Sequence, residues 1–367
     1  MLREPLPAPV SGPEARPPRP RLTWQQGMLS SLFGAWLIFG LFIDGWAHNH
    51  QKPETIFTPW HFILYSGFAA CALYAISIVR KSMVPGMSIW DAAPEGHALV
   101  LLGIGIFGVG ASGDLAWHSL FGIERSLAAL LSPTHLVMMI GAILVLTGPF
   151  RAAWADGRQW APTFKQFLPA LISLALTMAL VVFFFQYVNP MRQDVYGTWV
   201  SAYAAFVTRF KAAAGGITEN TEIVGLTSVV ITNLIYVAPL VFVLRRWRPP
   251  FGAMTVLFSA LTACAGGLDA YARPWPLLAA LPAGLLADVL IRRYRPGADR
   301  PWAAYAIAAA TALTLWVSFY GIYQVAYGVG WPAELWAGSI VSATISAFAV
   351  AVVVFPPRIP VPANIGA

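Results

Sequence analysis

Residues 28–61 read MLSSLFGAWLIFGLFIDGWAHNHQKPETIFTPWH, an apolar run that ends in a cluster of acidic residues and histidines. The run is long enough to cross a bilayer as a helix, since the hydrocarbon core is about 30 Å thick and a helix rises about 1.5 Å per residue. After the cluster, the chain turns back through Pro59 into a second apolar run. This stretch therefore predicts two membrane-spanning helices joined by a turn that carries ionisable side chains.

Apolar runs of this kind recur as far as residue 355, separated by short polar gaps. Of the 367 residues, 58% are hydrophobic and only 11% are charged, a balance outside the range of ordinary soluble domains. We therefore expect an all-α integral membrane protein with about ten transmembrane helices. The expected spans are 28–47, 59–80, 97–119, 132–150, 165–187, 222–244, 252–270, 274–291, 302–326 and 333–355.

The basic residues lie in the gaps between these spans and gather on one side of the predicted membrane. The N-terminal tail and the gaps on its side hold 17 of the 23 Lys and Arg residues, and the opposite gaps hold 6. Because cytoplasmic loops of membrane proteins carry the excess of Lys and Arg, both termini are predicted to be cytoplasmic. This distribution suits a bacterial inner membrane. The lipid bilayer is the expected partner, and no nucleic-acid partner is expected.

The chain divides into three expected segments. Residues 1–24 are rich in proline and arginine and are predicted to form a disordered cytoplasmic tail. Residues 25–152 contain the first four spans, arranged as two helical hairpins, and all six histidines of the chain. Residues 153–367 contain the other six spans, which we expect to form a scaffold or a substrate cavity beside the hairpins.

The same polar pattern occurs at the turn of both hairpins. Each copy reads Asp-x3-His-x5-Glu, then a spacer, and then Ser or Thr followed by Pro-x-His. The two copies lie 70 residues apart, and only the length of the spacer differs between them. The first copy comprises Asp44, His48, Glu54, Thr58, Pro59 and His61, and the second comprises Asp114, His118, Glu124, Ser132, Pro133 and His135.

Each part of this pattern has a structural meaning. Residues four apart share one face of a helix, so Asp44 and His48 are expected to project together from the last turn of the outgoing span. Thr58 suits the N-cap position and Pro59 the first helical position, which places His61 in the first turn of the returning span. The positive end of the helix dipole disfavours protonation of that histidine, which leaves the neutral imidazole that a metal requires.

The two hairpins are expected to be parallel repeats, because the first and third spans run in the same direction. An approximate twofold axis along the membrane normal would bring their polar side chains together at the extracytoplasmic face. Ionisable side chains at span ends are costly to bury without a partner, and a metal ion is a suitable partner. The predicted metal ligands are Asp44, His48, His61, Asp114, His118 and His135, and the predicted catalytic or proton-transfer residues are His50, Glu54 and Glu124.

The types of ligand indicate which metals to expect. Imidazole suits zinc, copper and iron, and the carboxylates shift the preference from cuprous copper toward iron, zinc or cupric copper. The Asp-x3-His pair resembles a fragment of the copper-binding pattern in the C subunit of membrane methane and ammonia monooxygenases. The resemblance covers that pair in each copy, Asp44 with His48 and Asp114 with His118. In the second copy, the next histidine of the pattern would fall at Leu131.

Together these features predict a membrane metalloenzyme, an oxidoreductase or oxygenase with a dinuclear iron or copper site and a lipophilic or small substrate. A zinc-dependent membrane hydrolase, a metal-ion transporter, and an assembly subunit served by a periplasmic electron or metal donor are the alternatives. A proton relay or a hydrogen-bonded network would use the same residues without a metal. Transport is disfavoured because polar groups within the spans, such as Asn233 and Gln324, are isolated.

Overall fold

In the computed structural model, the regular secondary structure of the described residues is helical, and no strand is assigned there. The all-α prediction is therefore confirmed for these residues. The described residues are 19–52, 55, 57–122, 126–157, 160–193, 196, 215–297 and 299–356. Most of the predicted N-terminal tail lies outside them, as do Glu54 and Glu124.

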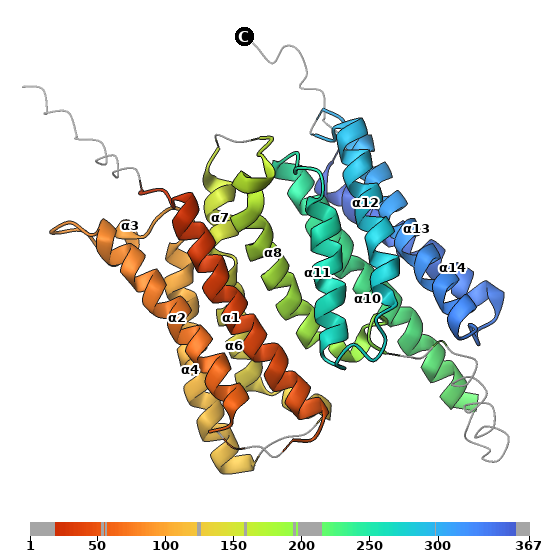
Figure 1. The fold of residues 1–367 in the computed structure, drawn as a ribbon, viewed down its shortest axis with the longest axis horizontal. Coiled ribbons are helices and arrows are strands. Elements are labelled where there is room, and N and C mark those ends of the chain that lie inside the picture. Colours follow the sequence, from red (N-terminus) through yellow and green to blue (C-terminus); the bar gives the residue numbers. More distant parts are fainter. Residues whose placement is uncertain are drawn as a thin grey trace, which may run out of the picture.

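The long helices lie side by side, and the turns between α1 and α2 and between α4 and α6 lie at the same end of the bundle (Figure 1). The elements are α1 (Trp24–Asn49), α2 (Pro59–Ser82), α3 (Ile89–Ala92), α4 (Ala98–Phe121), α5 (Ser126–Leu130), α6 (Pro133–Leu146), α7 (Gly148–Ala155), α8 (Phe164–Phe184), the 3-10 turn η1 (Gln186–Val188), α10 (Gly215–Arg246), α11 (Ala253–Gly267), α12 (Pro276–Tyr294), α13 (Pro301–Ala326) and α14 (Ala333–Val354).

Seven helices in the described residues are long and apolar enough to cross a membrane, namely α1, α2, α4, α8, α10, α13 and α14. Helices α6 and α7 meet the same requirement only as one span bent by 41°. Helix α11 is apolar but has 15 residues, and α12 has 19. Each of the ten expected spans coincides with one of these helices or with the bent pair. The prediction of a helical membrane protein is thus confirmed, and the count of ten spans stays a prediction.

Glycines allow the two helices of the first hairpin to pack closely. A Cβ atom at Gly40 in α1 would lie 2.5 Å from the Cα atom of Leu64 in α2. A Cβ atom at Gly67 in α2 would lie 2.7 Å from the Cα atom of Leu37 in α1. Any larger residue would clash at this separation, so glycine is required for the backbones to come so near, as is common between membrane helices.

The second hairpin has the same contacts at matching positions. A Cβ atom at Gly110 in α4 would lie 2.9 Å from the backbone nitrogen of Met138, and one at Gly141 in α6 would lie 2.5 Å from that of Phe107. In each hairpin, the glycine of the outgoing helix (Gly40 or Gly110) lies four residues before the motif Asp. The residue that this glycine contacts (Leu64 or Met138) lies three residues after the His of the returning helix. The second glycine follows that His by six residues. This shared register brings the Asp of the outgoing helix beside the His of the returning helix.

The returning helices α2 and α6 begin where the sequence predicts. A proline occupies the first turn of each helix, and Ser132 caps α6 by accepting a hydrogen bond of 3.3 Å from the backbone nitrogen of His135. Thr58 occupies the N-cap position of α2, but its hydroxyl lies 3.0 Å from Nδ1 of His61 and makes no cap hydrogen bond. Both histidines consequently lie in the first helical turn, level with the motif Asp of the neighbouring helix.

Helix α8 joins the hairpins to the second half, since it packs against α1 on one side and α11 on the other (Figure 1). The contact with α1 includes a hydrogen bond of 3.0 Å from the Ser31 hydroxyl to the carbonyl of Pro169. In the second half, Asn233 donates to the carbonyl of Ala343 at 2.7 Å and accepts from Nε1 of Trp316 at 3.1 Å. Asn233 thus ties α10 to α13 and α14, a role that sequence reasoning did not assign to it.

The glycine register can be tested by a pair of alanine substitutions. Gly141→Ala is expected to destabilise the protein by about 1–3 kcal/mol, because the added methyl group meets backbone atoms of α4 that cannot move aside. Gly108→Ala is the control, because a Cβ at that position in α4 meets nothing within 4 Å. Thermal unfolding of the two detergent-purified variants measures the difference. Equal melting temperatures would show that the glycine contact does not hold the hairpin together.

Candidate metal centre

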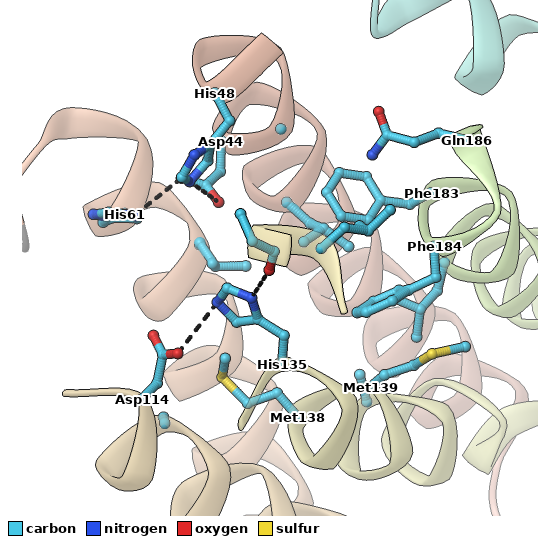
Figure 2. A pocket seen from close by; sticks show the side chains of 18 of the residues that line it. Asp44, His48, His61, Asp114, His135, Met138, Met139, Phe183, Phe184 and Gln186 are labelled. Carbon is cyan, nitrogen blue, oxygen red and sulfur yellow. Dashed lines mark hydrogen bonds and ion pairs between the residues drawn. The ribbon is translucent and has the colours of Figure 1, made fainter. Parts of the chain in front are cut away.

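The six predicted metal ligands are gathered in two groups of three. Figure 2 shows Asp44 close to His48 and His61, and Asp114 close to His135. Within each group, one ligand atom from each residue lies within 4.8 Å of the others. Helices α1 and α2 supply one group, and α4 and α6 supply the other. The first triad is Asp44, His48 and His61, and the second triad is Asp114, His118 and His135.

In the first triad, the Asp44 carboxylate lies between two imidazole rings. Its Oδ1 atom is 3.0 Å from Nε2 of His61, and its Oδ2 atom is 3.8 Å from Nε2 of His48. The other ring nitrogen of His61, Nδ1, lies 2.9 Å from the carbonyl oxygen of Thr55. The backbone before α2 therefore fixes the orientation of the His61 ring.

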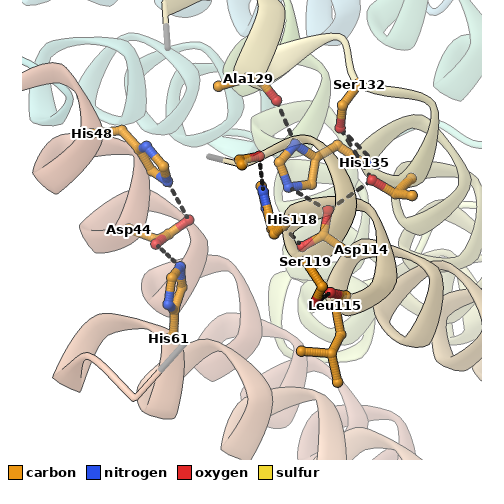
Figure 3. Close-up of polar contacts among 12 residues, drawn as sticks. Asp44, His48, His61, Asp114, Leu115, His118, Ser119, Ala129, Ser132 and His135 are labelled. Atoms are coloured by element: carbon orange, nitrogen blue, oxygen red, sulfur yellow. Dashed lines mark hydrogen bonds and ion pairs between the residues drawn. The ribbon is translucent and has the colours of Figure 1, made fainter. Parts of the chain in front are cut away.

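The second triad has the same arrangement on the neighbouring hairpin (Figure 3). The two oxygens of Asp114 each lie 3.3 Å from an Nε2 atom, one belonging to His118 and the other to His135. Nδ1 of His118 faces the carbonyl of Gly122 at 3.2 Å, and Nδ1 of His135 faces the carbonyl of Ala129. The ring centroids are 6.1 Å apart with planes at 59°, compared with 6.4 Å and 57° in the first triad.

These contacts decide which ring nitrogen carries the proton. A carbonyl oxygen can only accept a hydrogen bond, so Nδ1 is the protonated nitrogen in His61, His118 and His135. In a neutral ring, Nε2 then has a lone pair that faces a carboxylate oxygen, which is also an acceptor. Two acceptors at this distance repel each other unless a cation lies between them. Either an additional proton on each ring or a shared metal ion supplies that cation.

The surroundings of the two carboxylates strengthen this requirement. Asp44 Oδ1 is buried and accepts no hydrogen bond from any described residue, although Nε2 of His61 is 3.0 Å away. Asp114 is 6% exposed and accepts one hydrogen bond, of 2.7 Å, from the Thr134 hydroxyl. A buried carboxylate with so few donors is costly unless a positive charge compensates it.

The geometry of each triad fits a single divalent ion. Ligand atoms about 2.1 Å from a common ion lie about 3–4 Å apart, so the observed separations need only small side-chain movements. Two imidazoles and one carboxylate form the ligand set of many non-haem iron(II) sites, and closely related sets bind zinc. Hydrogen bonds from Nδ1 to backbone carbonyls are also typical of metal-bound histidines. The donor atoms and their orientation therefore suit a metal.

Both triads open onto one cavity of about 850 Å³, which lies between the two hairpins and α8. Figure 2 shows the labelled triad residues on one side of this cavity and Met139, Phe183, Phe184 and Gln186 on the other. Its lining is mostly apolar and reaches Leu37, two helical turns from Asp44 along α1. The site thus combines a polar end near the triads with an apolar interior.

Sequence reasoning missed several polar residues that line this cavity, among them Tyr65 and Gln186. Tyr65 follows His61 by one helical turn and is close enough to Asp44 and Asp114 to be affected by both carboxylate charges. The His-x3-Tyr spacing in an outer helical turn was the available signal for it. Gln186 comes from η1, far along the chain, and only the packing of α8 beside the hairpins brings it to the cavity.

The predicted catalytic residues are not all brought to this site. His50 lies at the end of α1, where its ring stacks on Trp46 with centroids 4.6 Å apart, and it does not line the cavity. Glu54 and Glu124 lie outside the described residues. The sixth histidine, His97, is buried at the opposite end of α4. The triads are therefore the part of the predicted site for which geometry is available.

Known proteins provide no closer guide to this site. No protein-family model matches the chain, and no curated protein or solved structure is significantly similar to it. The functional argument consequently rests on the triads, the cavity and the chemistry of their side chains.

Two single substitutions test whether each triad holds its own ion. We expect wild-type protein loaded with iron(II) to contain about two ions per chain, and Asp44→Ala and Asp114→Ala each to contain about one. His50→Ala is the matched control, because it removes a histidine next to the first triad without removing a triad member. Inductively coupled plasma mass spectrometry gives the metal content. If either aspartate substitution abolished all metal binding in folded protein, the triads would not be independent sites.

Proposed function

We propose that this protein is a membrane metalloenzyme, an oxidoreductase or oxygenase that acts on a lipophilic substrate. The observation that carries the proposal is the pair of two-histidine, one-carboxylate triads at the polar end of a largely apolar cavity. Three protein ligands leave coordination positions open, as in non-haem iron(II) oxygenases. Iron is therefore the favoured metal, followed by copper, and zinc would fit the same ligands.

The protein's own groups have distinct roles in this proposal. The four histidine Nε2 atoms and the two carboxylates hold the metals, and backbone carbonyls orient the rings through Nδ1. Thr134 positions the carboxylate of Asp114 through its hydroxyl. A bound iron or copper ion would supply redox chemistry and activation of dioxygen. The Tyr65 hydroxyl, at the cavity wall, is suited to donate a hydrogen bond to a bound molecule.

Two neighbouring single-ion sites fit the geometry better than one ion cluster held by all six ligands. The ligand atoms fall into two separate groups, and within each group the Asp uses both of its oxygens toward its own histidines. The cavity touches both groups, so a bound substrate would be in reach of either metal. His50, Glu54 and Glu124 stay proposed proton-transfer groups, and of these His50 lies in the described part of the chain.

Transport is the less favoured function. The inner wall of the cavity is lined by residues such as Leu37, Ile38 and Ala142, which offer no ligand to a desolvated ion. Asn233 is occupied by its hydrogen bonds to neighbouring helices, and the Gln324 side chain accepts one of 2.8 Å from the backbone nitrogen of Val329. A zinc hydrolase or an assembly subunit with a periplasmic donor would use the same triads, and metal identity separates these from a redox enzyme.

Labelled dioxygen provides a direct test of the proposed chemistry. Iron-loaded protein in vesicles of native membrane lipids, supplied with a chemical reductant, is expected to transfer heavy-oxygen label to a lipid or to another apolar molecule in the extract. Asp44→Ala and Asp114→Ala should each reduce this transfer by more than about 100-fold if both metals are needed. Asp299→Ala is the control, because that side chain is exposed and not part of either triad.

Label transfer and its dependence on both triads, measured by mass spectrometry of the extracted products, would support the proposal. The proposal is wrong if the triad variants match wild type, or if the same vesicles show metal flux or lipid-ester hydrolysis and no label transfer.

A further inference from the structure

The cavity beside the triads is too apolar to be a water-filled vestibule. Its deeper walls are formed by side chains such as Leu37, Leu180 and Phe184, and the polar groups are confined to the triad end. A bound water needs two to four polar partners, so an apolar space of this size favours an apolar occupant. Its volume of about 850 Å³ lies within the usual range for ligand pockets.

The exposed residues that line the cavity are apolar and polar, namely Phe57, Leu115 and Leu127 together with Asn49, Thr55 and Ser119. Two of the residues that line it, Phe57 and Leu115, are 94% and 51% exposed, so the cavity reaches the outer surface of the helices beside them. Helices α2 and α4, on which this opening borders, make few contacts with each other. Apolar side chains exposed on membrane-spanning helices, such as Leu115, face lipid, so a lipid can enter the cavity beside them.

One hydrogen-bond donor at the polar end has an unambiguous orientation. The side-chain oxygen of Gln186 accepts hydrogen bonds from Asn49 at 3.1 Å and from Arg192 at 2.6 Å. Because both partners donate, the amide oxygen faces them and the amide nitrogen faces the other way. Figure 2 shows that nitrogen directed into the cavity, across from the triads. Arg192 is itself held by two hydrogen bonds to Asp269, of 2.9 and 3.0 Å, so the Gln186 side chain is rigidly placed.

From these observations we infer that the cavity binds a lipid by one hydrocarbon chain, with an oxygen-bearing head group that accepts a hydrogen bond from the Gln186 amide. The chain lies along α1 toward Leu37, and the head group lies level with the triads because Gln186 is joined to Asn49 at the end of α1. Gln186 is therefore a positioning residue that selects a carbonyl, ether or hydroxyl oxygen. This assignment rests on the proposed function for its chemical purpose, but binding of the lipid requires no metal.

A photoreactive probe tests occupancy of the cavity. The probe is a long-chain methyl ketone with a diazirine at the far end of its chain, added to purified full-length protein whose metal content is measured in parallel. Cross-links are expected on peptides that contain Leu37, Ala142 or Phe183. Ala142→Phe fills the cavity and should reduce this labelling at least about fivefold, whereas Ile140→Phe, on the exposed side of α6, should leave it unchanged. Ala111→Phe provides a second filling variant from α4.

A second comparison isolates the hydrogen bond from Gln186. Gln186→Glu keeps the oxygen that Asn49 and Arg192 require and replaces the amide donor with a carboxylate oxygen. Labelling by the ketone should then fall about threefold to tenfold, since one hydrogen bond to a buried group is lost. A hydrocarbon probe of equal length should label wild type and variant alike.

The outcomes separate this inference from the proposed function. Cavity labelling in a protein that binds no metal would support the lipid site and overturn the proposed metalloenzyme. The lipid site would be overturned if a protein with its full metal content were labelled only at outward-facing residues. It would also be overturned if neither cavity-filling variant reduced the labelling of such a protein. Equal ketone labelling of wild type and Gln186→Glu would remove Gln186 from it.

Discussion

The contact between a carboxylate oxygen and Nε2 of a neighbouring histidine is the interaction on which the site depends. In His61, His118 and His135, where Nδ1 faces a carbonyl oxygen and carries the ring proton, this contact is unfavourable without a cation. Both hairpins place it in the same register. That register is set by backbone contact at Gly40 and Gly67 in one hairpin and at Gly110 and Gly141 in the other. Close helix packing thus brings the acceptors together, and the proposed metal ion would remove the repulsion between them.

The position of the triads in the bilayer explains why they are joined to a cavity. An ionisable group near the end of a span must face protein or a polar space, so the Asp and His side chains turn toward the centre of the first four helices. Helix α8 then closes the remaining side with Phe183, Phe184 and, through the next turn, Gln186. The second half contacts α8 and η1 through α10 and α11, and Arg192 forms an ion pair with Asp269 beside them.

Much of this could be predicted from sequence, and the limits have physical causes. Hydropathy located every long helix, and the repeated spacing identified all six triad residues, because helical periodicity and N-cap chemistry are local. The glycines four residues before each Asp were visible, but their partners depend on how two helices pack. Gln186 and the cavity wall could not be found, since they depend on contacts between distant segments. The number of ions depends on the same contacts and is a proposal.

Anomalous X-ray scattering from crystals of iron-loaded protein tests the central claim most directly, because it locates metal without reference to activity. The account predicts two peaks, one between the ligand atoms of Asp44, His48 and His61 and one between those of Asp114, His118 and His135. A single peak shared by both hairpins would contradict the separate sites. Iron at other residues only, or no iron bound at either triad, would contradict the metal assignment itself.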